Sequence, residues 1–380
     1  MVRRLVAALR ERWRGQLPPP RFPAVDGDAL RAALIRGLQG IPADVAADLH
    51  HVRLDARSPP WHDSGLDLAP GQWLSWFATG RVDLSRALDI AVGPDFQLWG
   101  RIGDGPVFRG TRPSHTVRAE RGGRLYLASY FPGEWASPAG DLSTSPAEYQ
   151  RVRGGLDVCI MRWQRDALPG LEALRERTDP GGLVGGEIER LRVPVTPPAG
   201  WQYLWFLGPA EIYRPGEARG SIHCHTRADV GILQRDVDLP LREDTRLEWR
   251  WRVDVLPSRF SEDTLPTHDY VSIAVEFESG IDITYYWSAG LPVGRGYWCP
   301  LPTWHRREFH VVVRSGPRDL GTWCEESRLL SADYRRYVGE PPARIRRVWL
   351  IANSLFQRRE GRCQYAVITL RSADSVVAVA

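Results

Sequence analysis

The chain has 380 residues, with 50 basic against 46 acidic side chains, and every basic residue is an arginine. Without lysine, the chain can form neither the Schiff base of pyridoxal phosphate enzymes nor the lysine-dependent phosphate loop of P-loop proteins. The usual GxSxG and GxGxxG signatures of serine hydrolases and dinucleotide-binding proteins are missing as well. Five arginines against Glu11 give residues 1–14 a net charge of +4, and the remaining 45 basic and 45 acidic residues cancel. The body therefore carries no net basic charge that would predict nucleic-acid binding.

Cysteine usage and hydropathy bear on the compartment. The five cysteines are far apart and form no CxxC pair, which predicts reduced, buried thiols in a cytoplasmic protein. Near the amino terminus, Leu5–Leu9 is shorter than the roughly 7–15 apolar residues of a secretion signal. No segment approaches the roughly 20 apolar residues that span a membrane. We expect a cytoplasmic protein without a transmembrane segment.

Periodicity divides the chain into helical and β-rich parts. Residues 2–14 fit a basic amphipathic helix that would dock on the body of the protein or on a partner. A second helix is expected over Ala29–Leu38, with Asp28 as its N-cap. Short strands separated by Gly and Pro begin at Val52, stop at a helix over Leu168–Arg177, and resume from Gly200. The predicted class is all-β, in four parts: a helical segment (1–45), a β-sandwich (46–165), a helical connector (166–199) and a jelly-roll-like β-sandwich (200–380).

Residues 61–163 resemble the galactose-binding bacterial lectin family. The resemblance rests on a tryptophan that enters a strand, on glycines at turns and on alternating strands, in the segments 61–66, 70–72, 78–80, 100–103, 123–127 and 155–160. In that family an Asn- and Asp-rich loop holds sugar and calcium. The corresponding loop here, residues 128–135, has no Asn and only one acid, Glu134, so calcium is not expected.

Five predicted strands of the second sandwich separate polar from apolar side chains, because successive side chains of a strand point to opposite faces. Their apolar sides are rich in Trp, Val, Ile and Phe, and their polar sides hold histidines, acids, arginines and tyrosines. The strands are expected over residues 221–225, 246–254, 270–277, 281–288 and 308–314. If the polar sides line one concave surface, that surface is the candidate site.

From about residue 245 to 370 the chain resembles a bacterial family of unknown function, number three thousand and forty-seven among the domains of unknown function. The shared segments are 247–253, 285–287, 312–316, 321–323, 333–334 and 339–342. The resemblance implies a jelly-roll-like sandwich in a bacterial protein and no settled activity. Where the family has paired acids before a strand that ends in Phe, this chain has His268-Asp269-Tyr270.

Three functions remain open for this surface. The first is cofactor-free acid–base chemistry of the lyase, isomerase or cyclase kind on an oxygen-rich small molecule or saccharide, since histidine titrates near neutral pH and arginine can hold an oxyanion. The second is carbohydrate binding without catalysis. The third is a cupin-like metal enzyme, in which His223, His225 and His310 would hold a metal ion. No other cofactor is expected for any of the three functions.

The candidate residues divide by role. Predicted catalytic groups are His223 or His310 as base, Tyr286 as acid and Glu276 to orient a histidine. Predicted ligand-binding residues are His225, Arg250, Arg252, Tyr270, His268 and Asp269, with the two arginines as anion holders.

Overall fold

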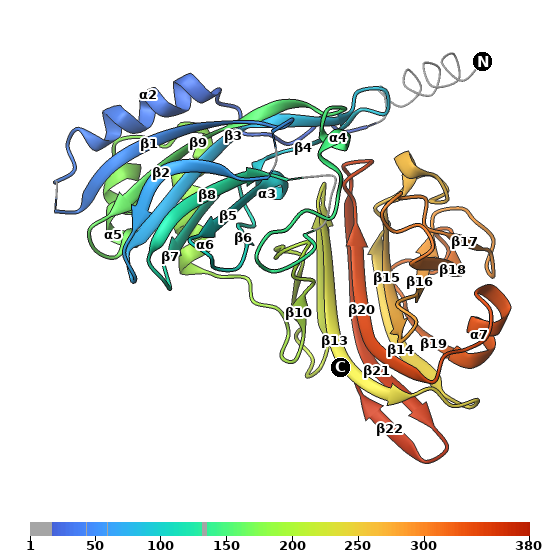
Figure 1. The fold of residues 1–380 in the computed structure, drawn as a ribbon. Helices are drawn as coiled ribbons and strands as arrows, with labels where there is room; N and C mark the ends of the chain where they lie inside the picture. Colours follow the sequence, from blue (N-terminus) through green and yellow to red (C-terminus); the bar gives the residue numbers. More distant parts are fainter. Residues whose placement is uncertain (1–16, 43, 59, 131–134) are drawn as a thin grey trace. The chain divides into compact units, whose positions relative to one another are not determined.

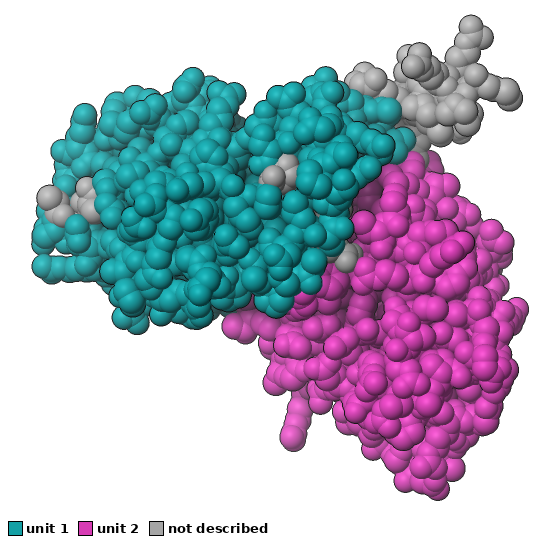
Figure 2. Space-filling model, viewed as in Figure 1, with its two compact units in different colours: residues 1–14, 20–194 teal, residues 15–19, 195–380 magenta. Residues whose placement is uncertain are grey.

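The computed structural model describes residues 17–42, 44–58, 60–130 and 135–380 (Figure 1). Their strands confirm the predicted all-β class, with only short helices. The chain forms two compact units, which Figure 2 colours separately. Among the described residues, unit 1 covers 20–194 and unit 2 covers 17–19 and 195–380. The expected helix over residues 2–14 and the loop acid Glu134 lie outside the described residues.

Unit 1 is a two-sheet sandwich with helices on one sheet. A five-stranded sheet has the order β1-β9-β3-β4, with β7 also paired to β3, and a four-stranded sheet has the order β2-β8-β5-β6. The strands are β1 (Ala46–Asp55), β2 (His62–Leu68), β3 (Trp73–Ser85), β4 (Ile90–Val92), β5 (Leu98–Ile102), β6 (Phe108–Arg109), β7 (Ser114–Arg118), β8 (Gly123–Ser129) and β9 (Arg153–Trp163). The helical segments are α2 (Gly27–Leu38), α3 (Pro94–Gln97), α4 (Pro146–Tyr149), α5 (Ala167–Arg175), η1 (Pro180–Gly182) and α6 (Leu183–Arg192).

Helices α2, α5 and α6 bury their apolar faces against the five-stranded sheet. Leu34 of α2, Leu171 of α5 and Ile188 of α6 share one core cluster with Met161 and Trp163 of β9. The segment expected as a connector therefore contributes its helices to unit 1. Helix α2 begins two residues before the predicted start, because the side chain of Asp26 is its N-cap and accepts a hydrogen bond from the Ala29 amide at 2.8 Å.

Unit 2 is a second sandwich of two larger sheets. The seven-stranded sheet has the order β10-β13-β20-β15-β16-β18-β17, and the six-stranded sheet has the order β11-β12-β21-β14-β19, with β22 paired to β21. The strands are β10 (Gln202–Tyr203), β11 (Tyr213–Pro215), β12 (Ile222–Arg227), β13 (Val230–Pro240), β14 (Arg246–Val255), β15 (Tyr270–Phe277), β16 (Asp282–Ser288), β17 (Gly296–Trp298), β18 (Glu308–Ser315), β19 (Trp323–Leu329), β20 (Arg344–Asn353), β21 (Glu360–Ser372) and β22 (Ser375–Ala378). The helical segments are η2 (Leu265–Thr267) and α7 (Leu330–Tyr337).

The main core of unit 2 lies between these two sheets. Trp249 and Trp251 of β14 face the seven-stranded sheet, where their rings meet Tyr285 at 5.8 Å and Trp287 at 5.7 Å. The apolar sides of all five strands singled out in the sequence join this one cluster, as predicted. Each sheet therefore turns its polar side chains away from the core, and the two polar faces lie on opposite sides of the sandwich.

One further observation concerns membranes. Among the described helices, none is long and apolar enough to cross a bilayer.

Candidate functional sites

The expectation of a single polar surface is wrong. Strands β12 and β14 belong to the six-stranded sheet, whereas β15, β16 and β18 belong to the seven-stranded sheet. His223, His225, Arg250 and Arg252 thus lie on one outer face of the sandwich, and the rest of the predicted site residues lie on or beside the other. The proposed pairing of a His223 base with a Tyr286 acid, and a metal held by His223, His225 and His310, would have to cross the core. Neither arrangement exists in this fold.

The outer face of the seven-stranded sheet is polar yet buried. Tyr286 and His310 are 0% exposed, and Tyr270 is 3% exposed. Apolar residues from the segments around 204–207 and 291–304 pack over part of this face, against Tyr270, Tyr286 and Trp349 among others. Because these side chains are enclosed, they cannot form the open concave surface expected for a saccharide.

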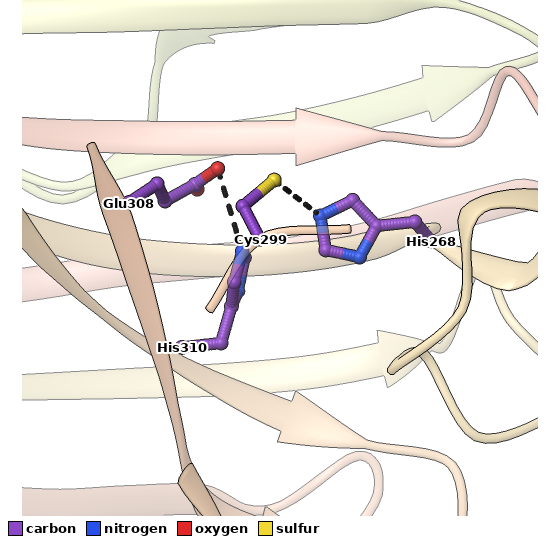
Figure 3. A group of neighbouring side chains, drawn as sticks. All are labelled: His268, Cys299, Glu308 and His310. Atoms are coloured by element: carbon purple, nitrogen blue, oxygen red, sulfur yellow. Dashed lines mark hydrogen bonds and ion pairs between the residues drawn. The ribbon is translucent and has the colours of Figure 1, made fainter. Parts of the chain in front are cut away.

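Four side chains of types that can bind metals converge within this buried region (Figure 3). His268 directly follows η2, Cys299 directly follows β17, and Glu308 and His310 project from the same face of β18. One ligand atom from each lies within 4.8 Å of all the others, and all four residues are buried. The Cys299 thiol lies 3.3 Å from His268 Nε2, and His310 Nε2 lies 3.3 Å from Glu308 Oε2.

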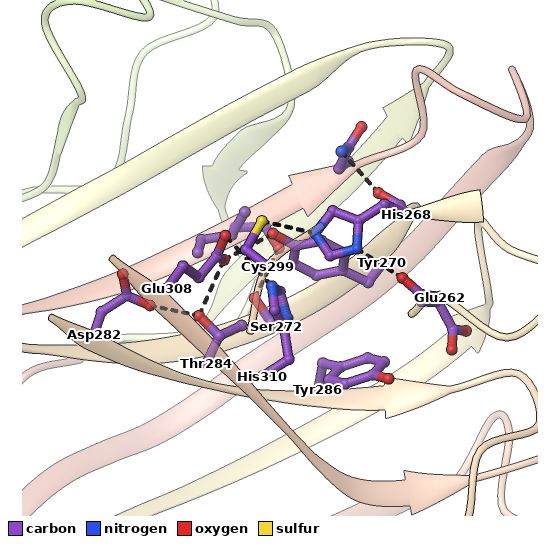
Figure 4. A network of polar contacts seen from close by, with 12 residues as sticks. Glu262, His268, Tyr270, Ser272, Asp282, Thr284, Tyr286, Cys299, Glu308 and His310 are labelled. Carbon is purple, nitrogen blue, oxygen red and sulfur yellow. Dashed lines mark hydrogen bonds and ion pairs between the residues drawn. The ribbon is translucent and has the colours of Figure 1, made fainter. Parts of the chain in front are cut away.

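Surrounding polar groups hold two of these side chains in place (Figure 4). The Tyr270 hydroxyl donates to Glu308 Oε1 at 2.9 Å. The Thr284 hydroxyl lies 3.2 Å from the same oxygen and donates at the shorter distance of 2.7 Å to Asp282 Oδ2. His268 Nδ1 lies 2.7 Å from the backbone carbonyl oxygen of Glu262, which assigns the proton to Nδ1 and leaves the Nε2 lone pair facing Cys299. His310 differs, because neither of its ring nitrogens makes a hydrogen bond among the described residues, and the close polar contact of its Nε2 is the ion-pair contact with Glu308 Oε2 at 3.3 Å.

Burial sets the protonation of the cluster. Burial lowers the pKa of His268 to about 3, with a smaller contribution from His310, so His268 is neutral at pH 7. Burial also disfavours the charged form of Glu308, but the adjacent His310 imidazole outweighs it and holds the pKa of this carboxyl at about 2. Two imidazoles, a carboxylate and a thiol within one buried cluster are side chains that transition metals accept as ligands.

The remaining predicted residues of this face have other partners. Tyr286 accepts a hydrogen bond from the Tyr297 hydroxyl at 3.0 Å. Both oxygens of Glu276 accept from Arg347 Nη1, at 3.1 and 2.9 Å, which occupies the group expected to orient a histidine. Asp269 accepts from the backbone amides of Phe356 and Gln357 at 3.0 and 2.6 Å, so it fixes a turn instead of facing a ligand.

The outer face of the six-stranded sheet is open to solvent and carries a cross-strand row of polar and aromatic residues. His223 pairs in register with Arg214 on one side and with Gln364 on the other, and Arg252 pairs with Gln364 and with Trp323. The row therefore reads Arg214–His223–Gln364–Arg252–Trp323 from β11 to β19. All five lie in half-buried or exposed positions, and Trp323 is 36% exposed.

Side chains next to this cross-strand row are largely paired with each other. His225 lies 3.1 Å from Glu360, and the Arg250 guanidinium lies 5.6 Å from the centre of the Trp323 ring. Within the row, Arg252 donates to Asp254 at 2.7 Å. By contrast, the side chains of Arg214, His223 and Gln364 make no hydrogen bond to another described residue.

Two members of the buried cluster were missed by sequence reasoning. Cys299 lies in an irregular segment, and nothing in its neighbourhood separates it from the other four buried cysteines. Glu308 was visible as part of Glu308-Phe309-His310, whose alternation places both polar groups on one strand face. That spacing could have indicated a ligand pair, but the third and fourth ligands come from segments whose path only the fold decides.

Comparisons with known proteins bear on the family and the fold. Residues 199–369 match the family model described as "Protein of unknown function (DUF3047)", in agreement with the resemblance predicted from the sequence. No match was found among curated proteins.

Several solved structures are similar to parts of the chain. They include a PllA-like lectin, the EclA N-terminal domain (14% identity, 30% of this chain and 95% of that chain, TM-score 0.24). Another is the xyloglucanase domain of NopAA from Sinorhizobium fredii (9% identity, 47% and 94%, TM-score 0.29). A third is the CBM22 tandem domain of Paenibacillus barcinonensis Xyn10C (7% identity, 79% and 79%, TM-score 0.21). At these TM-scores the likenesses carry no argument about ligand or activity.

Proposed function

We propose that unit 2 binds an acidic saccharide on the outer face of its six-stranded sheet. The observation that carries the proposal is the cross-strand row Arg214–His223–Gln364–Arg252–Trp323, which sets five side chains able to bind a sugar side by side on an open face. Four of the predicted site residues, His223, His225, Arg250 and Arg252, lie in or beside this row.

The dimensions and chemistry of the row suit an extended, oxygen-rich ligand. Neighbouring strands are about 4.8 Å apart, so five strands place the ends of the row about 19 Å from each other. That length matches a short oligosaccharide rather than a single ring. Trp323 offers a flat apolar surface at one end, and Arg214 and Arg252 offer planar donors for a carboxylate.

His223 and Gln364 supply neutral hydrogen bonds between the two arginines. Burial lowers the pKa of His223, with a further contribution from His225, so its ring is neutral at pH 7 and can both donate and accept. Gln364 likewise has a donor and an acceptor. Sugar hydroxyls need both kinds of partner, and the two arginines favour a ligand that is also anionic.

Binding is favoured over cofactor-free acid–base turnover. Tyr286, the acid expected to act with His223, lies on the opposite side of the core, and so does His310, the alternative base. On the open face, His223 has arginine and glutamine neighbours in the row but no tyrosine. The Tyr286 acid of the predicted lyase, isomerase or cyclase chemistry is therefore not available to His223 there.

Calorimetric titration of the full chain with a uronic-acid oligosaccharide and with its neutral counterpart tests the proposal. We expect the acidic ligand to bind more tightly, and Trp323→Ala and Arg252→Ala each to weaken binding about 10-fold or more. Arg246→Ala is the matched control, since Arg246 lies on the same face of β14, six residues or about 20 Å from Arg252. Equal affinities for all three variants and the unaltered chain, or no binding of either ligand, would refute the proposal.

A further inference from the structure

We propose that His268, Cys299, Glu308 and His310 bind one zinc ion inside unit 2. Two imidazoles, one thiolate and one carboxylate form a mixed nitrogen, sulfur and oxygen set that zinc accepts in four-coordinate sites. Hard cations such as calcium and magnesium prefer oxygen ligands only, so this donor set selects against them.

The geometry is close to what a tetrahedral ion needs. Zinc–ligand bonds of 2.0–2.3 Å place neighbouring ligand atoms about 3.3–3.8 Å apart. The Cys299–His268 and Glu308–His310 atom pairs are each already at 3.3 Å. All the remaining ligand-atom pairs lie within 4.8 Å, so closure around an ion requires side-chain shifts of about 1 Å and no movement of the strands.

The outer layer of the site is that of a metal centre. A zinc-bound histidine commonly donates its second ring nitrogen to a backbone carbonyl, as His268 Nδ1 does to Glu262. The Tyr270 hydroxyl donates to Glu308 Oε1, and Glu308 Oε2 lies 3.3 Å from His310 Nε2. These contacts orient one nitrogen and one carboxylate oxygen toward the same point (Figure 3).

Among the described residues of the cluster, His310 lacks the hydrogen bonds that a buried imidazole normally makes. Both ring nitrogens of His310 are buried without a hydrogen bond in the described part of the chain. An orphaned buried polar group costs about 1–3 kcal/mol, so such groups in a folded protein call for a partner. Glu308 is buried at 2% exposure and pairs with no arginine among the described residues. A bound cation would satisfy His310 and Glu308 together.

The arrangement assigns the ion a structural role. Four protein ligands fill a tetrahedral shell, whereas catalytic zinc keeps one position open for water or substrate. The ion would join β18 to the segment before β15 and to the segment after β17, which approach it from separate parts of the chain. On binding, the Cys299 thiol loses its proton to solvent and coordinates as a thiolate.

Metal analysis of the full chain, purified without chelator, gives the first test. We expect about one zinc per chain, and replacement by cobalt is expected to give the absorption of a four-coordinate ion with a thiolate-to-cobalt charge-transfer band. Cobalt bound without that band, or no binding to the chelated and refilled protein, would overturn the assignment. This measurement needs no variant and so does not depend on whether a variant folds.

A variant pair locates the site. Cys299→Ser is expected to abolish the charge-transfer band and weaken zinc binding at least about 100-fold, because it removes a ligand and not only an outer-layer contact. Cys324→Ser is the matched control, because Cys324 is also a buried thiol of unit 2 but belongs to β19 in the opposite sheet. Equal zinc affinity in the two variants would refute the site. Saccharide binding can be measured independently of zinc binding, because the residues proposed to bind the saccharide lie on the other side of the core.

Discussion

Replacement of Tyr270 by Phe isolates a single hydrogen bond in the buried cluster. The Tyr270 hydroxyl makes the shorter of two hydroxyl contacts to Glu308 Oε1, 2.9 Å against 3.2 Å from Thr284. The ring itself stays in contact with His268 and His310, whose centroids are each 4.9 Å away. A hydrogen bond to a charged group contributes about 1.5–3 kcal/mol, so Tyr270→Phe should lower the free energy of unfolding of unit 2 by about 2 kcal/mol.

The adjacent strand provides the control. Tyr285 lies on the core side of the same sheet, and its hydroxyl donates to Asp333 at 2.9 Å. Asp333 keeps two contacts from Arg328, at 2.8 and 2.6 Å, after that hydroxyl is lost. Tyr285→Phe should therefore lower the free energy of unfolding of unit 2 by only about 1 kcal/mol, because the Asp333 carboxylate stays paired with Arg328.

Scanning calorimetry in the presence of a chelator measures both costs without a metal contribution. For a domain of this size about 2 kcal/mol corresponds to about 4–8 °C in melting temperature, which calorimetry resolves readily. Without chelator, Tyr270→Phe should in addition weaken zinc binding about 10–100-fold, and Tyr285→Phe should leave it unchanged. Equal losses of stability in the two variants would refute the reasoning that Tyr270 makes the shortest hydrogen bond to a buried carboxylate that has no arginine among its described partners.

Three further predictions concern unit 1. Burial lowers the pKa of His115 to about 3, so the folded protein disfavours the charged ring. The free energy of unfolding should be highest above pH 6.5 and should fall as the pH falls toward 3, by at most about 2 kcal/mol at pH 5. His115→Phe should flatten this pH dependence, as measured by urea unfolding. Leu171→Ala empties a fully buried position and should cost about 2–5 kcal/mol in the unit 1 transition while the unit 2 transition stays in place, as calorimetry can show. Gly80→Ala would put a Cβ 2.3 Å from the Gly155 carbonyl oxygen at a φ of +117°, and should lower the free energy of unfolding by more than about 2 kcal/mol. Gly182→Ala, at a φ of +75° with open space around it, should lower it by only about 1 kcal/mol. Similar denaturation midpoints for the two variants would contradict this prediction.

Alternation along single strands was readable without a structure. The apolar sides of β12, β14, β15, β16 and β18 were predicted to share one core, and they do. The period of two in a strand is a local property, so it survives whatever sheet the strand joins. The same holds for the all-β class and for the helix near Ala29–Leu38, whose apolar spacing is a local signal, although its cap is Asp26 and not the predicted Asp28.

The pairing of those strands into sheets could not be predicted from the same pattern. A buried face must meet another buried face, but the pattern does not say whether two strands are neighbours in one sheet or face each other across the core. The sequence pattern therefore predicts that five strands that share a core share their outer face as well, and this prediction is wrong. In the structure β12 and β14 belong to one sheet and β16 belongs to the sheet that faces it across the core, which separates His223 from Tyr286.

Each candidate site combines residues that strand alternation predicts with residues that only the fold brings together. The sequence alone determined which side chains of each strand point away from the core. It therefore determined that His223 and Arg252, and likewise Glu308 and His310, point outward from their own strands. Only the tertiary structure decided that Arg214, Gln364 and Trp323 complete a row with the first pair, because register between distant strands depends on the whole sheet. Only the tertiary structure brought His268 and Cys299 to the second pair, because irregular segments take their path from the packing around them and carry no period of their own.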